Sequence, residues 1–355
     1  MSGTSLDGID VALLRTDGEH VVEHGPAASF VYKEEERDIL RRSLVSAREI
    51  SDRTDRNDAM LVAERMVGET HAVAVRSFLQ DNDLTLSNID VIGFHGQTVI
   101  HRPERGLTVQ LGLGKQLAKE LGIEVVYDLR AADVAAGGQG APLVPIYHQA
   151  LAAKLSLRPV VFVNIGGVAN VTFVDGSHLM AFDTGPGNAL IDDWVRQHTG
   201  ASCDENGALA KAGKIRQDVV EHFLRKPYFQ LPAPKSLDRN AFAEITMPDI
   251  SVADGAATLT AITAQSIAAS QNLMPSEPRQ WIICGGGRLN QALMQMLCDI
   301  LPNVKTAEDC GFNGDSMEAE AWAYLAVRSL HNLPITFPGT TGAKQPLTGG
   351  VLAKP

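Results

Sequence analysis

Short runs rich in Val and Ile alternate along this chain with longer segments of helical periodicity, and this alternation restricts the fold more than any other feature. In the first part of the chain the runs at 9–16, 89–96 and 123–129 are typical of strands. The segments at 34–47 and 57–80 are typical of helices. Strands that alternate with helices in this way indicate the α/β fold class.

The same alternation begins again after Gly137 and Gly138, so we expect two similar α/β halves. The elements expected in the second half are a helix from Pro142, strands at 159–165 and 168–174, a segment at 180–187 that runs into a helix, a helix at 256–271, a strand at 280–284, and helices at 290–301 and 316–330. The proline-rich segment at 226–250 has no clean periodicity and predicts a long surface loop of the kind that is often functional.

Length and composition favour a globular protein of two domains. The chain has 355 residues, of which 45% are hydrophobic and 21% charged, which argues against disorder. Its formal charge is −11 and it has no basic run, so nucleic acid is not an expected partner. The cysteines have no paired spacing, so we expect neither a zinc site nor disulfides, which fits a reducing cytoplasm: Cys203, Cys284, Cys298 and Cys310.

We expect no association with a membrane. The N-terminus lacks a basic segment followed by an apolar stretch. The most apolar region, 159–174, is interrupted by two asparagines and two glycines. A cytoplasmic protein is therefore expected.

The chain opens with the loop MSGTSLDGID, which is rich in glycine, hydroxyl and carboxylate groups. It supplies flexible backbone N–H donors, two hydroxyls and one carboxylate, and these groups can hold phosphate oxygens and a hard cation: Gly3, Thr4, Ser5, Asp7 and Gly8. An ordinary turn is the alternative interpretation.

Further glycine loops lie beside strands, at FHGQT (94–98), GGQGAP (137–142), NIGGVAN (164–170) and CGGGRLN (284–290). NIGGVAN lies between two strand-like runs, which predicts a hairpin whose glycine N–H groups can hold phosphate. CGGGRLN follows a strand and leads into a helix, where a nucleotide can lie against bare backbone. Tight-turn geometry is the alternative for each loop.

Two other motifs are excluded as nucleotide sites of familiar kinds. LGLGKQ at 111–116 lacks the glycine spacing of a phosphate-binding lysine loop and the hydroxyl residue after Lys115. GGGRLN fails the dinucleotide fingerprint because no suitable βαβ unit with an acidic ribose ligand follows it. The chain therefore has neither a Walker loop nor a Rossmann site.

A nucleotide can instead lie between two hairpin loops, one from each domain, as in the sugar kinase, actin and heat-shock ATPase superfamily. MSGTSLDG is then the first phosphate loop, NIGGVAN the second and CGGGRLN the adenosine loop. We expect domain I to comprise residues 1–130 and about 331–355, and domain II residues 131–330. The active site is expected in a cleft between them.

The ordered set of motifs resembles the anhydro-N-acetylmuramic acid kinase family through essentially the whole chain. The matching stretches are MSGTSLDGID, FHGQT, DLRAADVAAGGQGAPLVP (128–145), NIGGVANVT, FDTGPGNALID (182–192), PKS (234–236), CGGGRLN, MEAEAWAYLA (317–326) and TTGA (340–343). The resemblance implies ATP-dependent phosphorylation of 1,6-anhydro-N-acetylmuramic acid with hydrolytic opening of its anhydro ring. The implied product is N-acetylmuramic acid 6-phosphate, in bacterial peptidoglycan recycling, and a homodimer is also implied.

The resemblance implies that Asp183 is the catalytic residue, a general base that deprotonates the water attacking the anomeric carbon. The alternative is an aspartate that caps the helix beginning near Asn188. Asp7 is expected to help hold Mg²⁺ or to touch the sugar, with a turn-forming aspartate as the alternative. The ATP-binding residues expected from the three loops are Gly3, Thr4, Ser5, Leu6, Asp7, Gly8, Ile9, Asp10, Asn164, Gly166, Gly167, Asn170, Gly285, Gly286 and Gly287.

His95, Arg130 and Glu318 resemble the family's sugar-contacting positions. The guanidinium of Arg130 can pair with the lactyl carboxylate of a muramic sugar. A buried structural histidine and a solvated glutamate at a helix start are the alternatives for His95 and Glu318. Trp322 and Tyr324 are expected in the core.

The chain departs from the family pattern at its start, because family members usually carry a short apolar strand before the MSGTSLDG loop. We therefore expect that the strand at 9–16 lacks its natural hairpin partner: either the true start lies upstream, or the first sheet is missing an edge. If Met1 is an internal methionine of the natural reading frame, about ten further upstream residues would stabilise the strand by pairing its edge.

Two other functions are considered. An ordinary sugar kinase of the same fold would phosphorylate a free hydroxyl and consume no water. An ATP-driven switch of the heat-shock type would need an appended peptide-binding domain, and only 25 residues follow Leu330.

Overall fold

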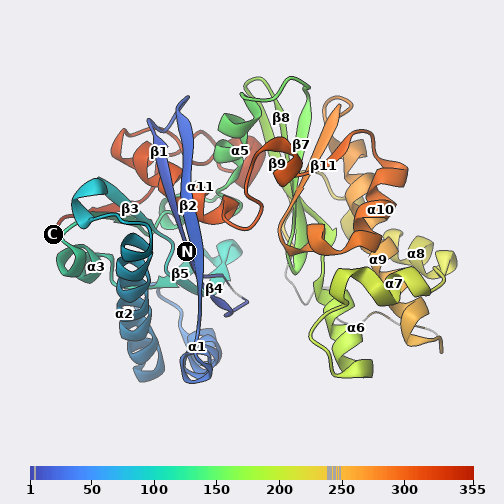
Figure 1. The fold of residues 1–355 in the computed structure, drawn as a ribbon, viewed down its shortest axis with the longest axis horizontal. Helices are drawn as coiled ribbons and strands as arrows, with labels where there is room; N and C mark the ends of the chain where they lie inside the picture. The colour runs from blue at the N-terminus through green and yellow to red at the C-terminus, as the bar shows by residue number, and fades with distance from the viewer. Residues whose placement is uncertain (4, 238–241, 243–244, 246, 248) are drawn as a thin grey trace. The chain divides into compact units, whose positions relative to one another are not determined.

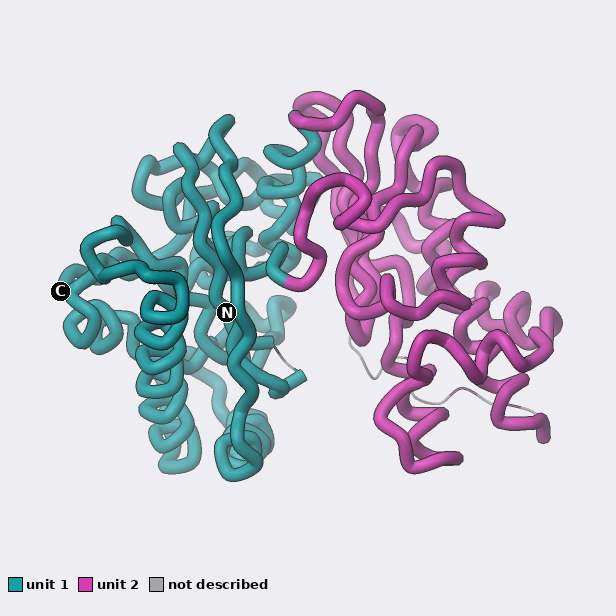
Figure 2. The backbone as a smooth tube through the Cα atoms, viewed as in Figure 1, with its two compact units in different colours: residues 1–153, 316–355 teal, residues 154–315 magenta. Residues whose placement is uncertain are grey.

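The structure is a computed structural model that describes residues 1–3, 5–237, 242, 245, 247 and 249–355. The chain forms two compact units, unit 1 (1–153 and 316–355) and unit 2 (154–315), which are coloured separately in Figure 2. The domain boundaries expected near 130 and 330 stay a prediction, and the compact units divide the chain elsewhere. Both units mix strands and helices, so the α/β prediction is confirmed.

Unit 1 contains three groups of paired strands with helices around them (Figure 1). Its strands are β1 (Gly8–Thr16), β2 (Val22–Val31), β3 (Val91–Phe94), β4 (Gln97–Arg102), β5 (Leu107–Leu111), β6 (Glu124–Tyr127) and β12 (Val351–Ala353). Its helices are α1 (Glu34–Ser46), α2 (Asp58–Asp81), α3 (Gly114–Leu121), α4 (Ala131–Ala135), α5 (Pro145–Ala152), α11 (Met317–Leu330) and α12 (Pro338–Thr341), with 3₁₀ turns η1 (Ala47–Glu49), η2 (Leu86–Asn88) and η3 (Pro103–Arg105).

Unit 2 is built on one five-stranded sheet of order β11-β10-β7-β8-β9. Its strands are β7 (Val160–Ile165), β8 (Val168–Asp175), β9 (His178–Pro186), β10 (Gln280–Cys284) and β11 (Val304–Thr306). Its helices are α6 (Ala189–Thr199), α7 (Ala208–Ala212), α8 (Gln217–Leu224), α9 (Val252–Ala269) and α10 (Gln291–Ile300), with 3₁₀ turns η4 (Glu205–Gly207), η5 (Pro227–Gln230), η6 (Ser270–Leu273), η7 (Gly286–Leu289) and η8 (Glu308–Cys310).

One face of the unit 2 sheet is the apolar core of that unit. Val163 of β7, Val171 of β8 and Phe182 of β9 are paired across the strands and point to this face. They belong to one core cluster with Ala264 and Ile267 of α9 and Leu293 and Leu297 of α10. The residues next in sequence therefore point to the opposite face, which carries the polar side chains described below.

β1 forms a hairpin with the strand that follows it, whereas the partner that we expected to be missing is an upstream strand, and this expectation stays a prediction. β1 pairs antiparallel with β2, and the ladder is irregular where Leu13 lies opposite Gly25 and Pro26. β2 was not predicted because it is largely exposed and contains both a glycine and a proline, so it shows no alternation of hydrophobic residues.

A groove separates the other edge of β1 from β3. Its walls are Ile9–Leu14 and Ile89–Phe94, and its lining includes His71 and Phe78 of α2. In the described part of the chain, the Ser2–Ile9 bridge is the pairing recorded at this edge of β1. That additional upstream residues would stabilise this edge stays a prediction.

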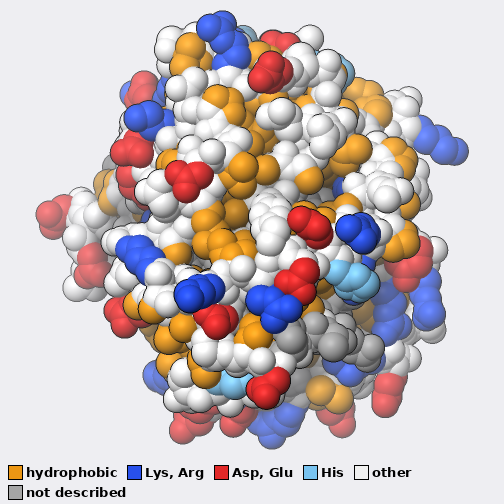
Figure 3. Space-filling model, turned by 90° about the vertical axis from the view of Figure 1, so that its right-hand side faces the viewer, with side chains coloured by type: hydrophobic (Ala, Val, Ile, Leu, Met, Phe, Trp, Pro, Cys, Tyr) orange, Lys and Arg blue, Asp and Glu red, His pale blue; other side chains and the backbone are white. Residues whose placement is uncertain are grey.

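On the face drawn in Figure 3, acidic and basic side chains are interspersed, and hydrophobic side chains lie between them. Among the described residues, no helix combines the length and the apolar character needed to cross a membrane.

Gly93 of β3 should be intolerant of a side chain, because a Cβ there would lie 2.1 Å from the carbonyl oxygen of Trp322 in α11. We expect Gly93→Ala to lower the free energy of unfolding by about 1–3 kcal/mol. The control is Gly68→Ala in α2, where no atom lies within 4 Å of the added Cβ. That change should stabilise by about 0.5–1 kcal/mol. Denaturant unfolding measures both, and equal midpoints for Gly93→Ala and wild type would contradict the close approach.

Candidate active site

The NIGGVAN segment forms the predicted hairpin turn between β7 and β8. The turn lies against the start of α6, because the N–H groups of Gly187 and Asn188 donate to the carbonyl oxygens of Gly167 and Gly166 at 3.0 and 2.8 Å. A Cβ on Gly187 would come within 2.3 Å of the Gly166 oxygen. The glycines of the two segments therefore permit a close backbone approach that other residues would prevent.

Strand register places three polar residues side by side across unit 2. Asn164 of β7 lies opposite Asn170 of β8, and Asn170 lies opposite Asp183 of β9. Cross-strand partners share a face of the sheet, and this face is opposite the apolar core. The pair of Asn170 and Asp183 continues the regular register that begins at Asp175 and His178. The ladder becomes irregular only beyond this row, where Ala169 pairs with Gly185 and Thr184 is skipped.

The CGGGRLN loop lies next to this row. β10 is parallel to β7 and its last residue, Cys284, pairs with Asn164. The loop follows at once, with Gly285 in the left-handed region at φ +73°. A Cβ on Gly285 would lie 2.3 Å from the Asn164 side-chain oxygen, and one on Gly287 would lie 2.3 Å from Ile165. The predicted phosphate hairpin and adenosine loop therefore meet within unit 2.

Asp183 is held by the segment that follows η5, which sequence analysis predicted to be a functional loop. Its Oδ2 accepts a hydrogen bond from the Leu237 N–H at 2.7 Å. Its backbone N–H donates to the Lys235 carbonyl at 2.9 Å, and its carbonyl accepts from the Tyr228 hydroxyl at 2.7 Å. Asn188 occupies the N-cap position of α6. The capping alternative for Asp183 is therefore wrong.

Burial raises the pKa of the Asp183 carboxyl to about 7, and the hydrogen bond from Leu237 acts in the opposite direction. A carboxylate with a pKa near neutrality is suited to accept a proton during a reaction at neutral pH. Its second oxygen, Oδ1, accepts no hydrogen bond recorded among the described residues.

Lys235 and Tyr228 were not predicted as site residues, although the PKS stretch contributed to the resemblance. The Lys235 side chain is buried, and its Nζ donates to the Tyr228 carbonyl at 3.0 Å and lies 4.6 Å from the Tyr228 ring. Burial lowers the pKa of the Lys235 ammonium. The signal that could have found Lys235 is a lysine directly after two closely spaced prolines, Pro232 and Pro234, in an otherwise aperiodic segment.

The N-terminal loop of unit 1 makes local hydrogen bonds through Asp7. Its Oδ1 accepts from the Ser5 hydroxyl at 2.6 Å and from the Gly8 N–H at 3.0 Å. Leu6 and Ile9 are buried in the core, so they can reach a nucleotide only through backbone groups. The Asp10 carboxylate accepts from Ser29 at 2.6 Å, and Thr4 lies outside the described residues.

The binding of a cation by Asp7 stays a prediction, and its hydrogen bonds to Ser5 and Gly8 also fit the turn interpretation. Its Oδ2 accepts no hydrogen bond recorded among the described residues. Mg²⁺ in phosphotransferases is typically held by one or two carboxylates, phosphates and water. Within the described residues no group of three or more His, Cys, Asp or Glu side chains could hold a metal.

His95, Arg130 and Trp322 form a cluster in unit 1. The His95 Nδ1 lies 2.8 Å from the Ser2 carbonyl and its Nε2 lies 3.3 Å from an Arg130 nitrogen, so both ring nitrogens are engaged. This geometry fits a neutral ring with Nδ1–H donating and Nε2 accepting. Burial, followed by the Arg130 charge, lowers the pKa of His95 well below its ordinary value. His95 therefore supports the loop at Ser2, and its contact with sugar stays a prediction.

Arg130 lies over the ring of the buried Trp322, with its guanidinium carbon 5.3 Å from the ring centroid. It also donates to the Gly140 carbonyl of the GGQGAP loop at 2.8 Å. Burial lowers the pKa of Arg130 to about 10, and the nearby charge of Glu318 opposes that shift. Arg130 stays cationic at neutral pH. His95 contacts it and the charge of Glu318 acts on it, and the binding of sugar by these three residues stays a prediction.

Comparison with known proteins gives a consistent result. The family model described as anhydro-N-acetylmuramic acid kinase matches residues 1–355. A protein of Agrobacterium fabrum with that name is 49% identical over all of this chain and 97% of its own length. A protein of Rhodopseudomonas palustris with that name is 52% identical over all of this chain and 98% of its own length. A solved xylulose kinase from Lactobacillus acidophilus is 13% identical with a TM-score of 0.37, over 70% of this chain and 53% of that chain.

The raised pKa of Asp183 makes stability depend on pH. Between about pH 4 and 7 the folded protein keeps this proton and the unfolded chain releases it, so the contribution of Asp183 to stability falls as pH rises to about 7. Asparagine does not titrate, so the stability of Asp183→Asn does not fall with pH for this reason. We expect the variant to gain stability over wild type on going from pH 5 to pH 8, by on the order of 2 kcal/mol.

Denaturant unfolding at the two pH values provides the measurement, with Asp299→Asn on the exposed surface of α10 as the control. The control should follow the wild-type pH dependence. A difference between Asp183→Asn and wild type that does not change with pH would contradict the raised pKa.

Proposed function

The chain belongs to the anhydro-N-acetylmuramic acid kinase family, and from this premise we propose how its residues perform the reaction. The substrates are ATP and 1,6-anhydro-N-acetylmuramic acid. The products are ADP and N-acetylmuramic acid 6-phosphate, which places the enzyme in peptidoglycan recycling.

The observation that carries the mechanism is the environment of Asp183. Its carboxylate is held through one oxygen by Leu237, it has a pKa of about 7, and it stands in a row with two asparagines beside the glycine loops. We propose that Asp183 takes a proton from a water as that water attacks the anomeric carbon. The bond from this carbon to O6 breaks, and O6 attacks the γ-phosphorus of ATP. Water thus supplies the new anomeric hydroxyl, and ADP leaves.

ATP is proposed to bind the backbone of three glycine loops. Loop 164–170 and the loop at Gly285–Gly287 lie together in unit 2, where bare backbone allows phosphate and adenosine to approach. The loop at Gly3–Asp10 supplies hydroxyl and N–H donors in unit 1. Mg²⁺, with Asp7 and the phosphates as ligands, would offset the charge that develops on the transferred group.

The sugar is proposed to bind the cluster in unit 1. Arg130 is a buried guanidinium fixed over Trp322, and a planar fork of donors suits the lactyl carboxylate of a muramic sugar. Glu318, which lies within electrostatic reach of Arg130, is proposed to orient sugar hydroxyls. His95 holds Arg130 in place through its Nε2. A homodimer in the cytoplasm is part of the same proposal and rests on the family resemblance.

The mass of the product tests this function against an ordinary sugar kinase. With ATP, Mg²⁺ and 1,6-anhydro-N-acetylmuramic acid, we expect a product that has gained one phosphoryl group and one water. In water labelled with ¹⁸O, the label should appear at the anomeric hydroxyl. A phosphorylated sugar that keeps its anhydro ring would favour a plain kinase, and ATP hydrolysis without sugar modification would favour an ATP-driven switch.

Asp183→Asn tests the proposed base, since asparagine has a similar size but cannot accept the proton. Removal of a general base typically lowers the rate by about 10² to 10⁴. We expect a loss in kcat of at least this size while ADP binding, measured by calorimetry, is retained. If the variant keeps most of its turnover, the base lies elsewhere, and Asp7 and Glu318 are the next candidates.

A further inference from the structure

Arg288 is a buried cation that immediately follows the glycines of the adenosine loop. Only 5% of its side chain is exposed, although arginine is usually a surface residue. Two of its groups bind the backbone of the loop itself, because its N–H and its Nη1 donate to the Gly285 carbonyl at 3.2 and 3.1 Å. Arg288 therefore closes the turn that begins at the left-handed Gly285.

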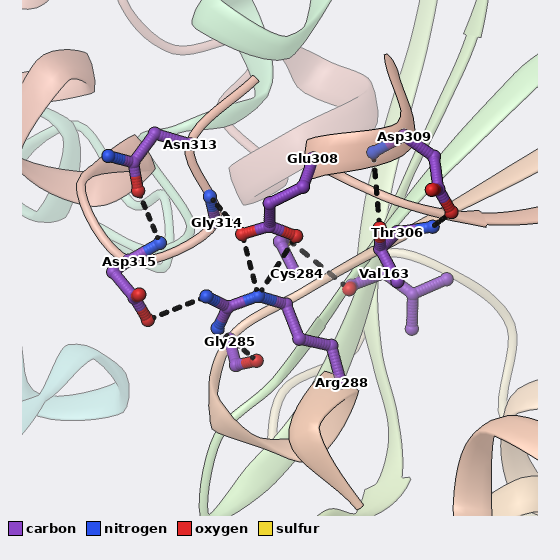
Figure 4. Close-up of polar contacts among 10 residues, drawn as sticks. All are labelled: Val163, Cys284, Gly285, Arg288, Thr306, Glu308, Asp309, Asn313, Gly314 and Asp315. Carbon is purple, nitrogen blue, oxygen red and sulfur yellow. Dashed lines mark hydrogen bonds and ion pairs between the residues drawn. The ribbon is translucent and has the colours of Figure 1, made fainter. Parts of the chain in front are cut away.

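The remaining nitrogens of Arg288 bind a different part of unit 2 (Figure 4). Its Nε donates to both oxygens of Glu308, at 3.0 and 3.2 Å, and its Nη2 lies 2.8 Å from Asp315. Glu308 also accepts from the Gly314 N–H at 3.1 Å. Arg288 thus joins the adenosine loop to the segment 308–315, where the chain leaves unit 2.

Close packing makes this junction specific for its residues. A Cβ on Gly314 would lie 2.6 Å from the Arg288 Nε, so the backbone of segment 308–315 lies directly against the guanidinium. A larger residue there would displace the guanidinium or the Glu308 carboxylate from its present position. The planar guanidinium contacts the carbonyl oxygen of the turn and both carboxylates at the same time, and a lysine ammonium cannot reach all three.

The charges of this junction are poorly placed for simple stabilisation. The guanidinium has been removed from water, whereas the side chains of Glu308 and Asp315 are 48% and 73% exposed. Desolvation of the cation opposes the attraction, and water screens its half-exposed partners. Such a group is more effective at holding backbone geometry than at raising the free energy of unfolding.

We propose that Arg288 is a positioning residue for the nucleotide, which fixes the backbone of Gly285–Gly287 by tying it to segment 308–315. This inference rests on the proposed function, in which that loop binds ATP. Three successive glycines lose much conformational freedom when a ligand orders them. A loop that is ordered before binding avoids this cost and binds more tightly. Arg288 acts on the loop, and its nitrogens are engaged with protein groups.

The test compares Arg288→Lys, Glu308→Gln and the double variant. We expect Arg288→Lys to weaken ADP binding and raise the KM for ATP by about tenfold, with kcat and the KM for sugar little changed. Glu308→Gln should give a smaller effect of the same kind, because it loosens Arg288 from a position half exposed to solvent. The double variant should lose no more than Arg288→Lys alone, since both changes break one junction.

Arg196→Lys is the matched control, because Arg196 forms an exposed ion pair with Asp193 in α6 of the same unit. It should bind ADP like wild type. Calorimetry of ADP binding and steady-state kinetics provide the measurements, with melting temperatures for every variant.

Wild-type ADP affinity in both Arg288→Lys and Glu308→Gln would overturn the inference and leave the proposed function intact. A lower melting temperature with unchanged KM for ATP would also overturn it, because the role would then be purely structural. Tighter ADP binding in Glu308→Gln would show instead that Arg288 contacts the nucleotide directly once released. If wild-type protein itself failed to bind ADP, the proposed function would fall, and this inference with it.

Discussion

The register of β7, β8 and β9 is the constraint on which the rest of the unit 2 site depends. It aligns Asn164, Asn170 and Asp183 on one face of the sheet while Val163, Val171 and Phe182 occupy the other. A slip of one residue would exchange the two sets, burying a carboxylate in the core and exposing valines. The apolar face packed against α9 and α10 therefore holds the polar row in place. Burial of the apolar side chains thus fixes the strand register, and the register in turn fixes the positions of the polar side chains on the opposite face.

Burial of charge is the second theme of the molecule. Asp183, Arg130 and Arg288 are ionisable groups largely removed from water. Each has a different set of hydrogen bonds and opposite charges that offsets the cost of burying its charge. Asp183 has a single hydrogen bond to a backbone N–H, which leaves its pKa near neutrality. Arg130 has a tryptophan face and the charge of Glu318. Arg288 has two carboxylates and a carbonyl. A buried charge with few hydrogen bonds or opposite charges around it has a shifted pKa and can exchange a proton near neutral pH. A buried charge with several such partners keeps its charge and can hold the surrounding backbone in place.

Elements with strong local periodicity were predicted well, and elements without it were not. α2, α9 and the β7–β8 hairpin lie where the pattern of apolar residues predicted them. β2 was missed because most of its residues are exposed and it contains Gly25 and Pro26, so pairing with β1 alone makes it a strand. The β4–β5 hairpin was likewise missed, because its short strands follow glycine-containing turns and gain their stability from distant parts of unit 1. Helix periodicity can be seen in residues that are close in the sequence. The pairing of a strand depends on other strands, so it cannot be recognised from the strand's own residues.

The sequence by itself determined the α/β class and the glycine loops, because side-chain type and local spacing are sufficient for these. The residues proposed to carry the chemistry came from the resemblance to the family, and their roles stay predictions. The sequence indicated Asp183, Asn164, Asn170, Arg130 and Glu318 one at a time. Only the tertiary structure decided that Asn170 stands between Asn164 and Asp183 in one row, that Leu237 and Tyr228 hold Asp183, and that Arg288 reaches Glu308 and Asp315. These contacts join residues far apart in the chain, and the pKa of Asp183 follows from its burial. Neither distance in space nor burial is encoded in local periodicity, since both arise when the elements pack together.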